Sequence, residues 1–358
     1  MNLEPEAERL RRLPLADYRP VPRLVTTRHQ VPRAALPAID SHAHLGRWLS
    51  PDGSWMVEDV GRLVAEMDEC NIAGIVNLDG RWGGELAENL ARYDHAYPGR
   101  FATCAHLDWR EVAEPGFGER LAAGLRASAQ AGAAGVKVWK DLGLHLRDYR
   151  GDLVLPGDER LGPVWAAAAD LGLPIFIHTA DPVAFFDPVD ERNERLEELL
   201  HHPDWSFTGP QFPTFQRLID SLESLVAAHP GTTIVGVHAG CYAENLDWVG
   251  RMLAAYPNFH IDIAARIAEL GRQPRATAAL VQRHPDRVLF GTDEIPPDPK
   301  MYSIYFRFLE TADEHFGYSL EDPPPTGRWQ ISGLDLPREV LRHVYYANAQ
   351  RLVPRLGG

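Results

Sequence analysis

The sequence has few cysteines, no long apolar run and no excess of positive charge. Its three cysteines, Cys70, Cys104 and Cys241, are odd in number and far apart, which excludes a disulfide framework or a zinc knuckle. No stretch of about 18 apolar residues is present, so we expect no transmembrane helix. The opening MNLEPEAERLRRLPL has no apolar segment ahead of a cleavage site. We therefore expect no secretory signal and a cytoplasmic location.

Acidic residues outnumber basic ones, with 50 Asp and Glu against 36 Lys and Arg, for a formal net charge of −14. Such a surface repels nucleic acid and anionic lipid, so the expected partner is a small-molecule substrate. Hydrophobic residues make up 45% of the 358 residues. This is enough for a substantial core, as in one large barrel or two ordinary domains.

A regular rhythm of short apolar runs and helical stretches begins after Pro37. Residues 1–37 are rich in Arg and Pro, and we interpret them as an extension ahead of a domain at 38–358. Eight runs with strand character follow: AIDSHAH, AGIVNLD, FATCAHLD, AGVKVWK, LPIFIH, TTIVGVHAG, FHIDIAA and RVLFGTD. Stretches of helical period separate them; Leu63, Met67 and Cys70, for example, share one helix face.

Strands that alternate with helices are expected to be parallel, because parallel neighbours need a crossover connection. Eight such units predict a (β/α)8 TIM barrel. The alternative is an open doubly wound sheet, which normally brings a glycine-rich phosphate loop, and no GxGxxG or GxxxxGK[ST] follows any strand here. Two connections are unusually long, 179–213 after strand five and 294–336 after strand eight. Both leave the active-site face of a barrel, so we expect them to shape a substrate pocket.

Histidines and acidic residues end several of these strands. Asp40, His42 and His44 end the first run, and period-two geometry puts them on one strand face. His178 ends the fifth run, His238 the sixth and Asp293 the eighth. Because these ends converge on one mouth, His42, His44, His178 and Asp293 form a suitable ligand set for a divalent ion such as zinc.

The motifs IDSHAHLG, PIFIHTAD, IVGVHAG, VLFGTD and YYANAQRLV span nearly all of 39–353. Together they resemble the amidohydrolase superfamily, specifically its amidohydrolase-related branch, which includes metal-dependent hydrolases and decarboxylases. The resemblance implies that His42, His44, His178 and Asp293 bind one divalent metal, with zinc expected and manganese an alternative. It also implies catalytic roles for Asp293, which would take a proton from metal-bound water, and for His238, which would polarise substrate or relay a proton.

The lysines of strand four bear on the number of metals. Lys137 and Lys140 lie three residues apart and therefore face opposite sides of the strand. In binuclear members of the superfamily a lysine on this strand bridges two metals, and the segment WKDL resembles that site, which favours Lys140. One metal is our interpretation, and a second metal held by Lys140 and His238 is the alternative. The inward lysine can instead bind a substrate carboxylate.

Four residues are candidates for substrate binding: Arg266, Lys137, Trp139 and His106. Arg266 follows strand seven, where it can clamp a carboxylate or pair with Glu269 on the next turn. Trp139 can stack a planar substrate, as can Phe185, Phe186 and Trp205 of the long loop, unless these aromatics pack the loop itself. Asp181 is a candidate to orient the His178 ring.

Three functions compete on this evidence. The leading hypothesis is a metal-dependent hydrolase, in which activated water attacks an amide, lactone or similar carbonyl. The second is a non-oxidative decarboxylase of an aromatic or unsaturated acid, which requires cationic groups such as Arg266 or an inward lysine facing the metal. The third is a barrel that binds without catalysis. The extension and the outer helices would suit a homodimer. The resemblance points the same way, because members of the family are often oligomers.

Overall fold

The computed structural model describes residues 4–357 of the chain, and parallel β-strands form its centre. The strands are β1 (Ala38–Ala43), β2 (Ile72–Asn77), β3 (Phe101–Thr103), β4 (Ala105–His106), β5 (Val136–Val138), β6 (Ile175–Ile177), β7 (Ile234–Gly236), β8 (Phe259–Asp262) and β9 (Val288–Leu289). Cys104 alone separates β3 from β4, which together occupy one barrel position. The eight positions coincide with the eight predicted runs.

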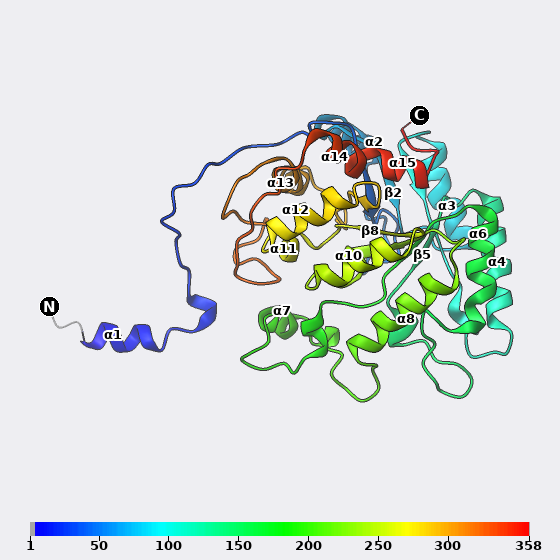
Figure 1. Cartoon of the computed structure of the whole chain (residues 1–358), viewed down its shortest axis with the longest axis horizontal. Helices are drawn as coiled ribbons and strands as arrows, with labels where there is room; N and C mark the ends of the chain where they lie inside the picture. The colour runs from blue at the N-terminus through cyan, green and yellow to red at the C-terminus, as the bar shows by residue number, and fades with distance from the viewer. Residues whose placement is uncertain (1–3, 358) are drawn as a thin grey trace.

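Helices follow the strands and cover the outside of the sheet (Figure 1). The longer ones are α2 (Val60–Cys70), α3 (Gly83–Leu90), α4 (Phe117–Ala131), α6 (Gly162–Leu171), α8 (Phe215–Ala228), α10 (Leu246–Ala255), α12 (Pro274–Arg283) and α13 (Pro299–Glu310). Shorter ones are α1 (Glu4–Arg11), α5 (Asp141–Leu144), α7 (Leu196–His201), α9 (Val237–Gly240), α11 (Ile267–Leu270), α14 (Arg338–Arg342) and α15 (Asn348–Leu352). No helix of the described residues is both long and apolar enough to cross a membrane.

Short helical turns complete the structure. They are η1 (Leu15–Asp17), η2 (Ala91–His95), η3 (Trp109–Glu111), η4 (Glu159–Leu161), η5 (Val183–Phe186), η6 (Pro203–Trp205) and η7 (His343–Ala347). Several of them belong to the connections at the carboxyl ends of the strands. The turns η5 and η6, for example, lie with α7 in the long connection after β6, the predicted loop at 179–213.

Backbone hydrogen bonds close the strands into a barrel. The strands pair in the order β1-β2-β3 and β4-β5-β6-β7-β8-β9, always parallel. The Ser41 N–H donates to the Phe290 carbonyl (2.9 Å) and the Asp293 N–H to the His42 carbonyl (2.7 Å), which joins the first strand to the last. The predicted (β/α)8 barrel is confirmed.

Two buried layers hold the barrel together. Alternate strand residues such as Val76, Phe176 and Val235 point into the interior, where they pack against Val353 and Leu356 of the C-terminal segment. Their strand neighbours pack outward against the helices, as period-two alternation requires. The apolar residues close one end of the barrel. The strands end in polar residues at the opposite end, which is the mouth.

The helix α2 shows how local sequence fixes the outer layer. Asp59 caps its first turn by accepting a hydrogen bond from the Arg62 N–H, and Asn71 ends it in a left-handed conformation. Leu63, Met67 and Cys70 are buried on one face, as their spacing predicts. The helix thereby covers the sheet beside β2.

Residues 4–37 extend away from the barrel (Figure 1). The segment contains α1 and η1 and contacts the body at Tyr18 and His29 before Ala34, which is buried and donates its N–H to the Cys70 carbonyl. The two long connections after β6 and β9 flank the mouth, as predicted.

Candidate metal centre

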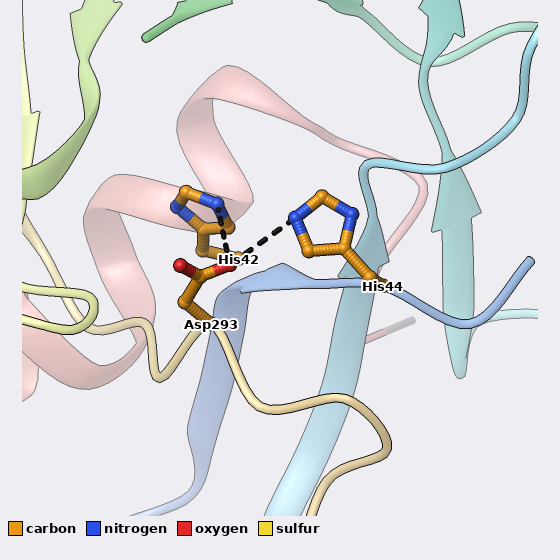
Figure 2. Close-up of side chains that lie close together, drawn as sticks. All are labelled: His42, His44 and Asp293. Atoms are coloured by element: carbon orange, nitrogen blue, oxygen red, sulfur yellow. Dashed lines mark ion pairs between the residues drawn. The ribbon is translucent and has the colours of Figure 1, made fainter. Parts of the chain in front are cut away.

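Three of the predicted metal ligands converge at the mouth of the barrel (Figure 2). His42 lies in β1, His44 is the first residue after β1, and Asp293 follows β9. The Nε2 atoms of His42 and His44 lie 3.2 Å and 3.1 Å from the same Asp293 oxygen, Oδ1. Both imidazoles are buried, and the Asp293 side chain is 23% exposed. The carboxylate therefore faces both the rings and the opening.

A buried carboxylate sets the orientation of the His42 ring. His42 Nδ1 lies 2.8 Å from Asp262 Oδ2, at the end of β8. Since an imidazole that donates from Nδ1 carries its lone pair on Nε2, this contact turns a ligand atom toward Asp293. Asp262 also accepts a hydrogen bond from the backbone N–H of His238 (2.7 Å), so it supports two mouth residues at once.

The charges at the mouth differ sharply between neighbours. Burial opposes protonation of His42, but the carboxylates of Asp293 and Asp262 raise its pKa overall. Burial lowers the pKa of His44 to about 4, so this ring is neutral. Burial also disfavours ionisation of Asp293, yet His42 and His44 outweigh it and hold its pKa well below the usual range. The Asp293 anion therefore lies between His42, whose protonation it favours, and the neutral ring of His44.

This donor set fits a divalent metal. Two imidazole nitrogens and one carboxylate oxygen lie within 4.8 Å of one another. Ligands about 2.0–2.2 Å from a tetrahedral ion are separated by roughly 3.3–3.5 Å, close to the distances seen here. Two imidazoles with one carboxylate therefore suit a divalent ion such as zinc, for which nitrogen and oxygen ligands are both common.

The two remaining histidines lie beside this group. His238 Nδ1 donates a hydrogen bond to the Ala264 carbonyl at 2.9 Å, so the lone pair of the ring is on Nε2. This Nε2 atom lies 3.9 Å from Asp293 Oδ2. Burial lowers the pKa of His238 well below its usual value, so it is neutral. The His178 ring is centred 4.6 Å from the His238 ring, and its Nε2 contacts Asp181 Oδ1 at 3.1 Å. His178 thus borders the group without sharing the Asp293 contact.

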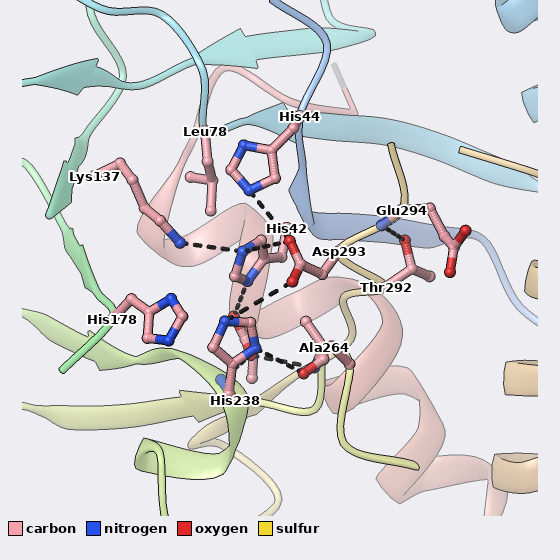
Figure 3. A network of polar contacts seen from close by, with 12 residues as sticks. His42, His44, Leu78, Lys137, His178, His238, Ala264, Thr292, Asp293 and Glu294 are labelled. Atoms are coloured by element: carbon pink, nitrogen blue, oxygen red, sulfur yellow. Dashed lines mark hydrogen bonds and ion pairs between the residues drawn. The ribbon is translucent and has the colours of Figure 1, made fainter. Parts of the chain in front are cut away.

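The chain has three lysines, and two of them, Lys137 and Lys140, lie three residues apart in and after β5. Lys137, in the middle of β5, points inward, is buried, and places Nζ 3.1 Å from His42 Nε2 (Figure 3). Lys140 lies beyond the strand and pairs with Asp181 Oδ2. The sequence favoured Lys140 as the lysine at the metal, but the structure brings Lys137, and not Lys140, to His42.

Aromatic rings line the wall beside the metal group. Trp139 packs against His44 with ring centres 5.0 Å apart and against Trp48 at 4.6 Å. His106 lies next to both tryptophans, with Nε2 2.7 Å from the Leu78 carbonyl. Trp48 belongs to the connection after β1, where no periodic pattern in the sequence predicts its position. These rings meet mostly edge to face, with 63° between the planes of Trp48 and Trp139, and form an aromatic cluster at the edge of the site.

Of the other predicted pocket residues, Arg266 lies near the mouth, and the aromatic residues lie in the long connection after β6. Arg266 is nearly buried and donates to the Ala265 carbonyl, while Glu269, its alternative partner, pairs with Arg195 instead. Phe185 stacks on Trp205, with ring centres 6.0 Å apart, inside the long connection after β6. Phe186 packs against Phe207 of the same connection (5.2 Å), so these aromatics build the loop core.

Asp40 does not join His42 and His44 as period-two geometry suggested. Its carboxylate instead contacts the Thr292 hydroxyl (2.6 Å) and the Tyr302 hydroxyl of α13 (3.0 Å). The pairing of β1 with β2 shifts register between Asp40 and Ala43, which breaks the alternation at that point. Asp40 thereby fastens β1 to the segment that carries Asp293.

Unusual backbone conformations concentrate at the same end of the barrel. His238, Ala239, Cys241, Ala265 and Asp293 have φ between 51° and 66°, in the left-handed region. Each follows β7, β8 or β9, and non-glycine residues pay a steric cost there that surrounding structure must offset. Such strain is common where side chains are held for function, and the sequence carries no pattern that reveals it.

Comparisons with known proteins agree with this geometry. A family model described as Amidohydrolase matches residues 39–355. An uncharacterized TIM-barrel protein, Bb4693 from Bordetella bronchiseptica, has a TM-score of 0.55 at 15% identity, covering 90% of this chain and 99% of that one. The 2,6-dihydroxybenzoate decarboxylase from Rhizobium has a TM-score of 0.55 at 16% identity, covering 89% and 99%.

A third solved structure is a dihydroxybenzoic acid decarboxylase from Polaromonas, with bound manganese and the inhibitor 2-nitroresorcinol. Its TM-score is 0.54 at 15% identity, covering 89% of this chain and 97% of that one. Likeness at such identities establishes the fold. No curated protein matches the sequence. The family match spans the whole barrel with its candidate ligands, and it confirms the resemblance seen in the motifs: the chain belongs to the amidohydrolase family, a family of metal-dependent enzymes.

Proposed function

We propose that the protein is a metal-dependent decarboxylase, which removes carbon dioxide without oxidation from an aromatic or unsaturated carboxylic acid. The observation that carries this proposal is a pair of buried basic side chains, Lys137 in contact with His42 and Arg266 near His238. In the described part of the chain neither forms an ion pair with a carboxylate; Lys137 contacts His42, and Arg266 contacts a backbone carbonyl. A carboxylate of the substrate would supply the missing negative charge.

The metal would be held by His42, His44 and Asp293, with His178 as the fourth predicted ligand. When bound, it supplies a positive charge that polarises the oxygens of the substrate. Asp262 fixes the ring of His42 for this purpose through the 2.8 Å contact.

The wall of Trp48 and Trp139 supports a planar acid. Trp139 packs against His44, and Trp48 meets Trp139 edge to face, so a flat substrate would stack on one of these rings beside the metal ligands. The decarboxylases among the structural neighbours act on dihydroxybenzoates, which are planar acids of this kind. Within the class, a hydroxylated benzoate is our first candidate substrate.

The reaction needs a proton at carbon. The bond between the carboxyl carbon and the ring breaks, its electron pair stays on the ring carbon, and that carbon takes a proton as CO2 leaves. His238 Nε2 and Asp293 Oδ2 lie 3.9 Å apart at the open side of the group, and either can hold this proton. His238 donates from Nδ1 to the Ala264 carbonyl, so its Nε2 lone pair faces Asp293 and can relay a proton to the carbon.

The test is a direct assay for CO2. The purified protein, loaded with zinc or manganese, is incubated with a panel of hydroxybenzoates labelled at the carboxyl carbon. We expect labelled CO2 and, in D2O, a product with deuterium at the carbon that lost the carboxylate. Lys137→Met and Arg266→Met should raise KM for the active acid. A panel without CO2 release, at one metal per chain, would contradict the proposal.

Hydrolysis of an amide or lactone is the second candidate, and one observation favours it. Asp293 is kept ionised beside two imidazoles and is partly open to solvent, as a base that takes a proton from water should be. The two candidates share these residues but not the need for buried cations. Lactone or amide turnover that survives Lys137→Met and Arg266→Met would identify the hydrolase.

A further inference from the structure

The extension ahead of the barrel exposes an unusual amount of apolar surface. Twelve large hydrophobic side chains are exposed in the described residues, and half of them lie within residues 10–25. They are Leu10, Leu15, Tyr18, Val21, Leu24 and Val25, the last of which is 101% exposed. An apolar stretch this dense on an otherwise ordinary surface marks a segment that another surface covers.

The same segment opposes the rest of the chain in charge. Residues 18–33 contain four arginines, three prolines and no acidic residue, whereas the whole chain has a formal net charge of −14. Prolines keep such a segment extended, with its side chains free to contact a groove. The arm, as we call residues 4–33, is therefore an extended, basic and apolar strap.

The arm is an addition to the family fold. The family model begins at residue 39. Solved barrels such as Bb4693 align over 99% of their own length but over only 90% of this chain. The barrel thus needs no arm to fold in its relatives, so the exposed residues require another explanation.

A groove of about 790 Å³ on the barrel has the complementary character. It lies between the start of α2 and the segment 294–300, beside the loop that carries Asp293. Met56, Leu63, Ile295 and three prolines supply an apolar lining. Five acidic residues surround it against two cations: Glu58, Asp59, Glu66, Glu294 and Asp298 against Arg62 and Lys300.

The arm of the same chain is fastened away from this groove. His29 contacts Asp313, and the carbonyl of Tyr18 accepts a hydrogen bond from Arg328; both partners follow α13. The groove lies at the opposite, N-terminal end of α13, and twelve helical residues span about 18 Å. The arm therefore projects from one end of α13 while the groove lies at the other.

We propose that two copies of the chain form a dimer in which residues 19–25 of each arm bind the acidic groove of the other. Arg19 and Arg23 would face the groove carboxylates, and Val21, Leu24 and Val25 would cover its apolar lining. An exchange of this kind is reciprocal, so it closes as a two-fold dimer. It would also brace the 294–300 segment that follows Asp293.

A charge swap on the full chain tests both partners of the contact. One variant carries Arg19→Glu and Arg23→Glu in the arm, and the other carries Glu58→Arg and Glu66→Arg in the groove. Light scattering should give twice the chain mass for the native protein and the mass of one chain for each variant alone. An equimolar mixture of the two variants should return to twice the chain mass, because each arm then meets a groove of opposite charge.

Several outcomes would overturn the proposal. A native protein with the mass of one chain, variants that stay dimeric alone, or a mixture of folded variants that does not reassociate would each do so. If the arm occupied its own groove, mixing would change nothing. Circular dichroism establishes that each variant is folded.

A second substitution tests the apolar half of the contact. Val25 is fully exposed in a single chain, so Val25→Asp should not disturb folding, yet it should reduce the dimer to the mass of one chain. The matched control is Leu171→Asp on α6, at an exposed apolar residue outside the arm and the groove, which should leave the dimer intact. A dimer that survives Val25→Asp contradicts the assigned contact.

Discussion

The protein contains two clusters of buried charged residues. They differ in whether the charges pair with one another within the chain. In the first, Arg195 pairs with Glu198 at 2.7 Å and also with Glu269, and all three side chains are at most 9% exposed. The cluster ties the long connection after β6 to α11. A guanidinium between two carboxylates meets its partners within the chain, so this cluster is a structural tie.

The second cluster, around His42, is incomplete. The Nε2 atoms of His42 and His44 converge on Asp293, and Lys137 contacts the His42 imidazole and forms no ion pair with a carboxylate of residues 4–357. Arg266 nearby also lacks an acidic partner among residues 4–357. On the proposed function, a metal and an acidic substrate would supply the partners that these buried groups lack. Ion pairing within the chain therefore distinguishes the structural cluster from the candidate functional one.

The largest effect is expected from Asp293→Asn. This change removes the carboxylate that both His42 and His44 contact, so we expect turnover to disappear. Metal affinity should fall by more than about 100-fold, since even residues behind the ligands contribute 10–100-fold. The melting temperature should change little. Elemental analysis and calorimetry check the prediction, and a variant that keeps both its metal and its activity would contradict it.

The complementary change is Glu269→Gln in the first cluster. It leaves Arg195 short of a buried partner, and breaking such a pair costs about 3–5 kcal/mol of folding free energy. Metal content per folded chain should stay the same. Denaturant unfolding measures the loss. Asp170→Asn, which breaks the exposed pair with Arg126, is the matched control and should cost less than about 1 kcal/mol.

Much of the fold could be read from the sequence because its signals are local. All eight apolar runs became barrel strands, and the Leu63, Met67 and Cys70 face of α2 is buried as its spacing requires. The metal group was also accessible, since histidines and an aspartate that end parallel strands must meet at one edge. Strand-end position alone thus predicted that His42, His44 and Asp293 lie together, and their role as metal ligands stays a prediction.

The sequence did not reveal contacts between distant segments. Asp262 ends β8 like the other mouth residues. It is 220 residues from His42 in the sequence, and only closure of the barrel brings its carboxylate to the His42 ring. The shift of register in β1 sends Asp40 toward Tyr302, which alternation along one strand cannot predict. Likewise, Arg195 and Glu269 come from separate connections, so their pairing depends on how the loops fold over the mouth.

A smaller effect is expected from a comparison of the two lysines. Lys137→Met should lower kcat/KM by roughly 30- to 150-fold, since the loss of a buried charge from a binding contact costs about 2–3 kcal/mol. Lys140→Met removes a partly exposed pair with Asp181 and should change kcat/KM by less than about threefold.

Metal analysis of the same two variants sharpens the comparison. One metal per chain should remain in both, as we infer for the native protein. A fall from two metals to one in either variant would instead make that lysine a metal ligand. Equal losses of activity in the two variants would contradict the assignment of Lys137 to the site.

The smallest effect concerns Asp79, a buried carboxylate that belongs to neither cluster. It follows β2, is fully buried and forms no ion pair within residues 4–357, and burial raises its pKa from the ordinary 3.8 to about 7. The folded protein thus holds this proton more tightly than the unfolded chain does. Its stabilising effect is complete below about pH 4 and is lost as the pH rises to about 7. Asp79→Asn removes the titration, so the variant should gain a few degrees in melting temperature relative to the native protein across this range. A constant difference between pH 4 and pH 7 would show that Asp79 ionises like an ordinary aspartate, and that a buried carboxylate outside both clusters needs no partner to stay charged.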